Sequence, residues 1–389
     1  MNVKEFFAPR NFLNWFLFAI PAAVIMNFTV GPGVPLFIVS AIAVVPLAGQ
    51  MGHATEALAT RTSAAMGGFL NASLGNLAEL LIAAVALLKG PDHVAIVKAS
   101  ITGSIIGNLL LVMGAAIFAG CLKREHMRFN RTMASTGSSL LFLSVIGLLV
   151  PSMFAATHQD AAGRVDLHTL SMWVSGILLF VYACSLWFSL KTHKAVLAIE
   201  GGKDWERPGE PAPDLNPMDD EGHGPHMSSK AAITVLCIAT LGVVFMAEML
   251  IASVEIASHA WGMSQIFVGV VIVAVVGNAA EHSSAIMCAM RGNMDLGVNI
   301  PIESSKQIAL FAAPFLVFFA AAIGVPLDLD FSTFEILAVA LSVIIVHMIT
   351  SDGETHWLEG VQLLAVYLIF AVVFFFLTDA DAASKLSGG

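Results

Sequence analysis

Two glutamates of this chain each stand in the middle of a long apolar run. Glu79 lies inside the run 66–88, and Glu281 lies inside the run 264–290. Each run is long enough to cross a bilayer, where an ionised carboxylate is costly unless it is paired or functional. We therefore expect both runs to span a membrane and both carboxylates to serve the activity of the protein.

The glutamates belong to two related motifs. The sequences are GNLAE at 75–79 and GNAAEH at 277–282. In each motif an asparagine precedes the glutamate by three positions, so the amide and the carboxylate share one helix face. These asparagines are Asn76 and Asn278. Because the motifs lie in different halves of the chain, they can form opposite walls of a single cation site.

The composition excludes a soluble globular protein. Of the 389 residues, 57% are hydrophobic and 12% are charged, and the mean hydropathy is +0.84. The net charge of −10 gives no indication of a nucleic-acid partner. The four cysteines are isolated, which favours neither a disulfide framework nor a zinc site. We expect the chain to reside in a lipid bilayer.

The apolar segments predict an all-α integral membrane protein with eleven transmembrane helices. The expected spans are 12–30, 34–59, 67–88, 93–120, 133–153, 168–191, 230–260, 264–290, 294–321, 332–350 and 356–377. We expect the first of them to be a span and not a cleaved signal peptide. Several runs exceed the ~20 residues that a span needs, which indicates tilted helices.

Lysine and arginine gather on one side of this arrangement. With eleven spans, the N-terminus and every second loop share a side, and that side carries most of the basic residues. Basic residues favour the cytoplasmic side of a membrane. We therefore predict a multi-pass protein of the bacterial inner (plasma) membrane, with its N-terminus in the cytoplasm.

The two motifs predict a repeat with inverted topology. Five spans separate the helix of Glu79 from that of Glu281, so the two helices enter from opposite sides, and sites in such folds form near the midplane. The expected parts are an N-terminus with an extra first helix (1–33), a first five-helix repeat (34–191), an acidic cytoplasmic linker (192–229), a second, inverted five-helix repeat (230–378) and a C-terminal tail (379–389). The linker is rich in proline and acidic residues, which favours a solvated connection, with a regulatory cation sensor as the alternative.

Further polar residues follow the two motifs at similar distances. They are Ser104, Asn108, Ser304, Ser305 and Gln307. We expect them to line the site or to couple protons to it. His282 directly follows Glu281 on a different helix face, where it is either a hydrogen-bonded core histidine or a proton relay. Two acids near span ends, Glu56 and Glu255, either admit the cation or are ordinary interfacial residues.

These motifs resemble those of the bacterial-type calcium/proton exchanger (CAX) family of the cation/calcium exchanger superfamily. The matching stretches are 46–48 with 54–56, 70–80, and 277–282 with 307–311. The resemblance covers nearly the whole chain. It implies one extra helix followed by two inverted groups of five, with an acidic cytoplasmic segment between the sixth and seventh spans.

The resemblance implies a secondary active antiporter that exchanges calcium for protons by alternating access, and thus a role in calcium homeostasis. Calcium takes about six to eight oxygen ligands, and we expect Glu79, Glu281, Asn76 and Asn278 to supply some of them. Protons compete for the two glutamates, because two empty carboxylates in a low-dielectric site repel each other. Calcium and protons are then substrates, no cofactor is required, and the protein is not an enzyme. Whether it forms a homo-oligomer stays open.

Other transport classes and an enzyme are the alternatives. A sodium/proton or potassium/proton antiporter could use the same scaffold, since carboxylates do not select calcium by themselves. A channel is less consistent with repeat-related buried acids and no pore-loop signature. A membrane-embedded hydrolase lacks support, because no HExxH or GxSxG motif is present.

The chain departs from the family pattern at one place. Family members carry a Gly-Ser-Ser stretch before the glutamine, whereas residues 303–307 read ESSKQ here. Glu303 and Lys306, three positions apart, can form an intrahelical ion pair. The alternative is that the ammonium of Lys306 occupies a position where relatives hold a mobile cation.

Overall fold

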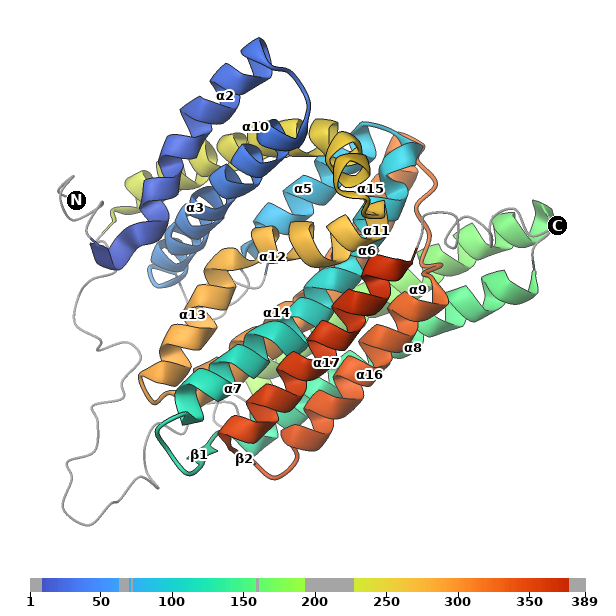
Figure 1. Cartoon of the computed structure of the whole chain (residues 1–389). Helices are drawn as coiled ribbons and strands as arrows, with labels where there is room; N and C mark the ends of the chain where they lie inside the picture. The colour runs from blue at the N-terminus through green and yellow to red at the C-terminus, as the bar shows by residue number, and fades with distance from the viewer. Residues whose placement is uncertain (1–8, 63–69, 71–72, 159–160, 193–226, 378–389) are drawn as a thin grey trace.

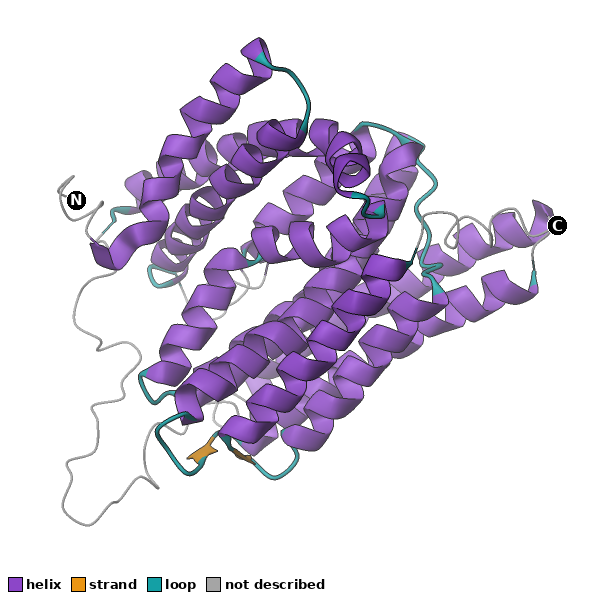
Figure 2. Ribbon diagram, in the orientation of Figure 1, coloured by secondary structure: helices purple, strands orange, loops and turns teal. Residues whose placement is uncertain are grey.

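The computed structural model describes residues 9–62, 70, 73–158, 161–192 and 227–377. Helices make up nearly all of this part of the chain, and its only strands are the two-residue β1 (Met127–Arg128) and β2 (Glu354–Thr355) (Figure 2). The predicted all-α fold class is therefore confirmed. Most of the predicted acidic linker, the C-terminal tail, and Asn71 and Ala72 of the first signature stretch lie outside the described residues.

The helices of the first half follow the predicted spans closely. They are η1 (Pro9–Phe18), α2 (Ala19–Thr29), α3 (Val34–Ala59), α5 (Leu77–Leu88), η2 (Pro91–His93), α6 (Val94–Ile106), η3 (Gly107–Val112), α7 (Met113–Cys121), α8 (Arg131–Thr157), α9 (Ala161–Trp187) and η4 (Phe188–Thr192). One difference concerns the span predicted to begin at residue 67: residues 73–74 are helical, but a turn at 75–76 separates them from α5, which begins at Leu77.

The second half shows a similar series. Its helices are α10 (Ser229–Trp261), α11 (Gln265–Phe267), η5 (Val268–Val273), α12 (Ala274–Gly277), α13 (Ala279–Met290), α14 (Met294–Gln307), η6 (Ile308–Ala312), α15 (Ala313–Ile323), α16 (Thr333–Ile349) and α17 (Trp357–Phe376). Local sequence sets several of their ends. Gly262 ends α10 in the left-handed conformation (φ 63°), and Ser332 forms a capping box with Glu335 at the start of α16.

Seven helices in the described ranges are long and apolar enough to cross a membrane. A bent pair, Gln265–Gly277 with Glu281–Met290, passes the same test with an angle of 63° between its halves. Three shorter apolar helices, Asn14–Thr29, Leu77–Leu88 and Thr333–Ile349, coincide with the remaining predicted spans. The protein is thus a multi-span membrane protein, whereas the count of eleven crossings stays a prediction.

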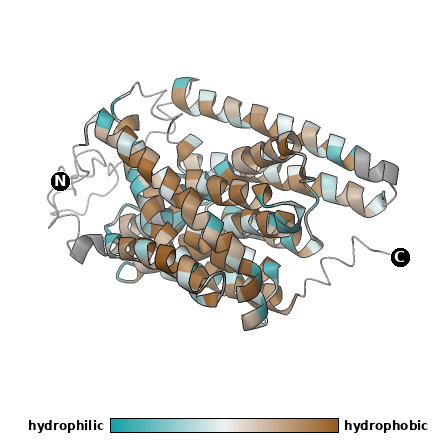
Figure 3. Ribbon diagram, turned by 90° about the horizontal axis from the view of Figure 1, so that it is seen from above, coloured by the Kyte–Doolittle hydropathy of each residue, from teal (hydrophilic) through white to brown (hydrophobic). Residues whose placement is uncertain are grey.

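Apolar side chains cover the outside of the helices as well as their interior. Large residues such as Phe28, Trp173, Leu241 and Phe376 are mostly exposed, and apolar colouring runs along the helices (Figure 3). In water this surface would be unfavourable, but in hydrocarbon it is the expected solvent-facing surface. The outer surface therefore agrees with a bilayer environment.

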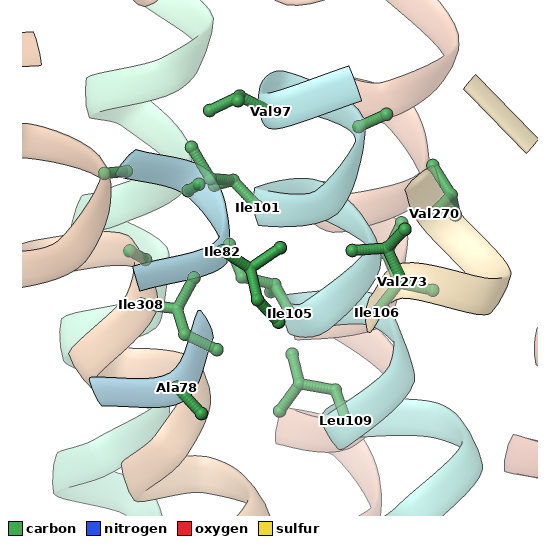
Figure 4. Packing of buried hydrophobic residues seen from close by; sticks show 14 of the residues in the cluster. Ala78, Ile82, Val97, Ile101, Ile105, Ile106, Leu109, Val270, Val273 and Ile308 are labelled. Atoms are coloured by element: carbon green, nitrogen blue, oxygen red, sulfur yellow. The ribbon is translucent and has the colours of Figure 1, made fainter. Parts of the chain in front are cut away.

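The core is built around the long α6–η3–α7 segment. Ile105 and Leu109 of this segment are fully buried, and Figure 4 shows them among side chains of α5, η5 and η6. Both α6–η3–α7 and α14–η6–α15 contain a π-helical turn midway, a feature often found near functional sites. On the other side of the molecule α3 packs along α10, and α2 packs against α3 (Figure 1).

Contacts between loops agree with the predicted alternation of sides. Strands β1 and β2 pair antiparallel and join the α7–α8 loop to the α16–α17 loop, with a 2.9 Å ion pair between Arg128 and Glu354. At the other end of the molecule, Lys98 near the start of α6 forms an ion pair with Asp328 in the α15–α16 loop. Each contact joins segments that the eleven-span topology assigns to the same side. The cytoplasmic position of the N-terminus stays a prediction.

Candidate cation site

Both acidic motifs lie where a helix begins. Asn76 precedes α5 with φ −96° and ψ 26°, and Asn278 precedes α13 with φ −99° and ψ 4°. Each glutamate then falls in the first turn of its helix. The motifs therefore share one backbone geometry, with each asparagine at a helix break and not inside a continuous helix as predicted. The positive end of each helix dipole favours a negative charge at this point.

Groups from both halves of the chain surround Glu79. The Ser104 hydroxyl and the Asn278 amide both donate to Glu79 Oε1. Asn278 Nδ2 also lies 3.1 Å from Ser104 Oγ and 3.1 Å from the carbonyl oxygen of Ala274. The structure thus brings the asparagine of the second motif onto the glutamate of the first.

A matching set of contacts surrounds Asn76. Its Nδ2 donates to the carbonyl oxygen of Ser304 and to Oε1 of Gln307, both at 3.3 Å, and its Oδ1 accepts from Ser304 Oγ at 3.1 Å. Asn108 Nδ2 donates to Ser304 Oγ at 2.9 Å, and Asn108 Oδ1 lies 3.2 Å from His282 Nε2. Each motif asparagine therefore contacts the serine of the opposite half, Ser104 or Ser304.

Three oxygens of the two motifs are left without a partner. Glu79 Oε2, Glu281 Oε2 and Asn278 Oδ1 are buried and make no hydrogen bond to any described residue. A buried oxygen without a donor is costly, and a carboxylate costs most. The Glu281 carboxylate also lies close enough to repel a negative charge on Glu79. A bound hard cation would satisfy these oxygens and offset that repulsion.

The remaining predicted lining residue, Ser305, contacts the backbone of α6. Ser305 Oγ is 3.5 Å from the carbonyl oxygen of Ile105 on α6, so it contacts backbone and not the glutamates. The two span-end acids, Glu56 and Glu255, are exposed near the C-terminal ends of α3 and α10. Glu255 lies 4.0 Å from His259. A role for these acids in admitting the cation stays a prediction.

The unusual pair on α14 forms the predicted ion pair. Lys306 is 5% exposed and binds Glu303, whose side chain is 36% exposed. Glu303 lies beside Gly137 of α8, where a Cβ atom would be 3.9 Å from its Oε1. The ammonium is therefore directed along α14 toward α8, and the structure gives no contact between it and the site glutamates.

Two glycines that position the site were not predicted from the sequence. A Cβ atom on Gly103 would lie 2.3 Å from the carbonyl oxygen of Val270, so α6 and η5 cross in direct backbone contact beside Ser104. A Cβ atom on Gly277 would lie 2.9 Å from Cγ of Glu79. Their position next to the motif residues is the only signal that the sequence offered.

The site is poor in conventional metal ligands. In the described ranges no group of three or more His, Cys, Asp or Glu side chains could hold a metal ion. A cation between the two motifs would be held by two carboxylates together with amide, hydroxyl and carbonyl oxygens. That ligand set suits a hard cation such as calcium better than zinc.

Comparison with known proteins finds strong similarity over most of the chain. The family model described as "Sodium/calcium exchanger protein" matches residues 32–191 and 231–376. A Ca(2+)/H(+) antiporter of Synechocystis is 42% identical over 343 residues, which cover 88% of this chain and 91% of the relative. The Ca(2+)/H(+) antiporter ChaA of Bacillus subtilis is 37% identical, with coverage of 92% and 97%.

Solved structures show the same fold. The structure of native YfkE matches with a TM-score of 0.78 and 34% identity, and the match covers 94% of this chain and all of that one. The H+/Ca2+ exchanger CAX matches with a TM-score of 0.64 and 15% identity, covering 96% and 94%. This second likeness concerns the fold alone.

Proposed function

Because the chain belongs to the sodium/calcium exchanger protein family, we propose that it is a secondary active antiporter that exchanges calcium for protons across a membrane. The resemblance to calcium/proton exchangers is confirmed, and the relatives are named as antiporters, not enzymes. Calcium and protons are its substrates, and transport needs no resident cofactor. A sodium/proton or potassium/proton antiporter is not favoured by the relatives.

One observation within the molecule supports this activity above the others. Three buried oxygens from the two repeat-related motifs, on Glu79, Glu281 and Asn278, have no hydrogen-bond partner in the described part of the chain. They include two carboxylate oxygens in a membrane interior, where an unused charge is strongly disfavoured. A divalent hard cation is the ligand that best compensates two carboxylates at once.

The same pair of carboxylates explains how protons are coupled to calcium. With calcium bound, both glutamates stay ionised because the metal offsets their burial. Without calcium, their mutual repulsion in a low-dielectric site favours the uptake of protons. Calcium and protons therefore compete, and exchange is coupled if the empty, doubly charged site crosses the membrane poorly.

The helix arrangement supports alternating access. Helices α3 and α10 pack along each other beside the segments that carry the site, α5–α7 and α12–α15. We propose that α3 and α10 move against this core and expose the site to each side in turn. The division into inverted repeats at 34–191 and 230–378, the bacterial inner membrane and the cytoplasmic N-terminus belong to this proposal.

Liposomes test the activity directly. Purified protein is placed in vesicles that contain a pH-sensitive dye and either calcium, sodium or potassium, diluted into cation-free buffer. Acidification inside the vesicles with calcium alone is the expected result. Acidification with sodium or potassium but not with calcium would overturn the proposal.

A further inference from the structure

We infer that His282 is a positioning residue: it supplies the last hydrogen bond of a series that holds Asn76. The two motif asparagines then differ in role. Asn278 offers its oxygen to the cation, whereas Asn76 is held by hydrogen bonds. This inference rests on the proposed cation site. The contacts that carry it join Asn76, which precedes α5, to Ser304 of α14, Asn108 of η3 and His282 of α13.

The direction is set by a backbone carbonyl. The carbonyl oxygen of Ser304 can only accept, so the group of Asn76 that faces it at 3.3 Å is Nδ2. The Oδ1 atom of Asn76 then faces the Ser304 hydroxyl at 3.1 Å. The same hydroxyl also reaches the Glu281 carboxylate. Whichever of the two oxygens takes the single hydroxyl hydrogen, Ser304 Oγ has no second hydrogen to donate.

The hydrogen bonds from Ser304 to His282 also have fixed donors and acceptors. Because Ser304 Oγ has only one hydrogen, it must accept from Asn108 Nδ2 at 2.9 Å. Asn108 therefore turns Oδ1 toward His282, whose Nε2 lies at 3.2 Å. An amide oxygen cannot donate, so His282 Nε2 carries a hydrogen. His282 thus supplies the last donor of the series.

The result for Asn76 is full use of its amide. Both hydrogens of Nδ2 are donated, to Ser304 O and to Gln307 Oε1, and its Oδ1 lies 3.1 Å from the Ser304 hydroxyl. Asn278 differs at its oxygen: its Nδ2 donates to Glu79 and to the carbonyl of Ala274, while its Oδ1 is buried and has no partner among the described residues. A cation can bind Asn278 Oδ1 without breaking a hydrogen bond.

One sequence position accounts for this difference between the two motifs. The second motif ends in His282, whereas the corresponding position of the first motif is Leu80. A leucine side chain has no hydrogen-bond donor, so the first motif has no counterpart of the donor that His282 offers to Asn108. Without the donor, Asn108 Oδ1 would be left buried and unpaired, and the amide would rotate to find another partner. The order of Asn108, Ser304 and Asn76 would be lost with it.

This role differs from a proton relay in what a substitution can restore. A positioning donor needs a hydrogen on a side chain of similar reach, which glutamine provides through Nε2. A relay needs a group that gains and loses a proton, which glutamine does not provide. The variants His282→Leu and His282→Gln therefore separate the two roles. His347→Leu is a matched control, because His347 lies on α16 and takes no part in these hydrogen bonds.

The test measures calcium binding by calorimetry and calcium/proton exchange in liposomes for the full-length protein and these variants. We expect His282→Leu to weaken calcium binding by about tenfold, the cost of one buried unpaired acceptor. His282→Gln should recover binding to within about threefold, with an unchanged pH profile of transport, and His347→Leu should bind like the parent protein.

A second comparison addresses the asparagines. Asn278→Ala should lose calcium binding more severely than Asn76→Ala, because only the former removes an oxygen offered to the cation. Equal losses in the two asparagine variants, or a His282→Gln variant as impaired as His282→Leu, would overturn the inference. If the parent protein itself fails to exchange calcium for protons, the proposed function fails instead.

Discussion

Loss of the Ser104 hydroxyl is the perturbation whose effect follows most directly from the site geometry. The hydroxyl donates to Glu79 Oε1, and it lies on α6 next to the backbone crossing at Gly103. A hydrogen bond to a charged group contributes about 1.5–3 kcal/mol. Ser104→Ala removes this bond from the ionised carboxylate and leaves only the Asn278 amide as a donor to that oxygen.

The bond favours the ionised form of Glu79, which is the form that binds calcium. Each ~1.4 kcal/mol corresponds to a factor of ten in the dissociation constant, so loss of this bond should weaken calcium binding by about 10- to 100-fold. Protons should also compete better in the variant, so that the loss grows as the medium becomes more acidic. Calorimetric titration of the purified protein with calcium, repeated over a range of pH, measures both effects.

A matched control is available on α8. Ser138 is buried and makes no hydrogen bond within the described ranges, so Ser138→Ala removes the same atom without touching the site. It should bind calcium like the parent protein. If Ser104→Ala also binds like the parent at every pH, the Ser104 contact has no energetic role and the reasoning is refuted.

Three further predictions concern packing, the ion pair and the ligand. Gly103→Ala places a Cβ atom 2.3 Å from Val270 O, so α6 and η5 must move apart. We expect thermal denaturation to show a loss of about 1–3 kcal/mol in unfolding free energy, and liposome flux to show slower transport. Glu303→Gln leaves the buried Lys306 ammonium unpaired and should destabilise the protein by about 3 kcal/mol. The double variant with Lys306→Met should recover stability in the same denaturation assay, with unchanged calcium affinity. Calcium at a hundred times its dissociation constant should raise the unfolding free energy by about 2.7 kcal/mol, and a chelator should remove this gain. A melting temperature that the chelator leaves unaltered would argue against a specific site.

The general fold and the meeting of the two motifs could be predicted from the sequence. Long apolar runs identify spans because hydrocarbon leaves few alternatives for a chain of this composition. Glu79 and Glu281 stand out for the same reason, since a carboxylate within such a run needs a partner or a function. Related motifs in two halves of opposite topology then indicate a shared site.

The pairing of side chains within the site could not be predicted. Whether Asn76 meets Ser304, or Asn278 meets Glu79, depends on the depth and rotation of each helix, which the periodicity of an apolar segment does not specify. The helix breaks at the Gly-Asn pairs before α5 and α13 were not predicted either, because the apolar residues on both sides of each pair made the segment look like one continuous span. His282 was assigned two possible roles, and only the 3.2 Å contact with Asn108 favours the hydrogen-bonded one.

The central claim is that calcium and protons compete for Glu79 and Glu281. The most direct test adds calcium to purified protein in weakly buffered solution and follows the protons released with a pH-sensitive dye. We predict proton release from the parent protein on calcium binding, less release from Glu79→Gln and Glu281→Gln, and none from the double variant. Calcium binding without proton release, or release that the substitutions leave unchanged, would contradict the account.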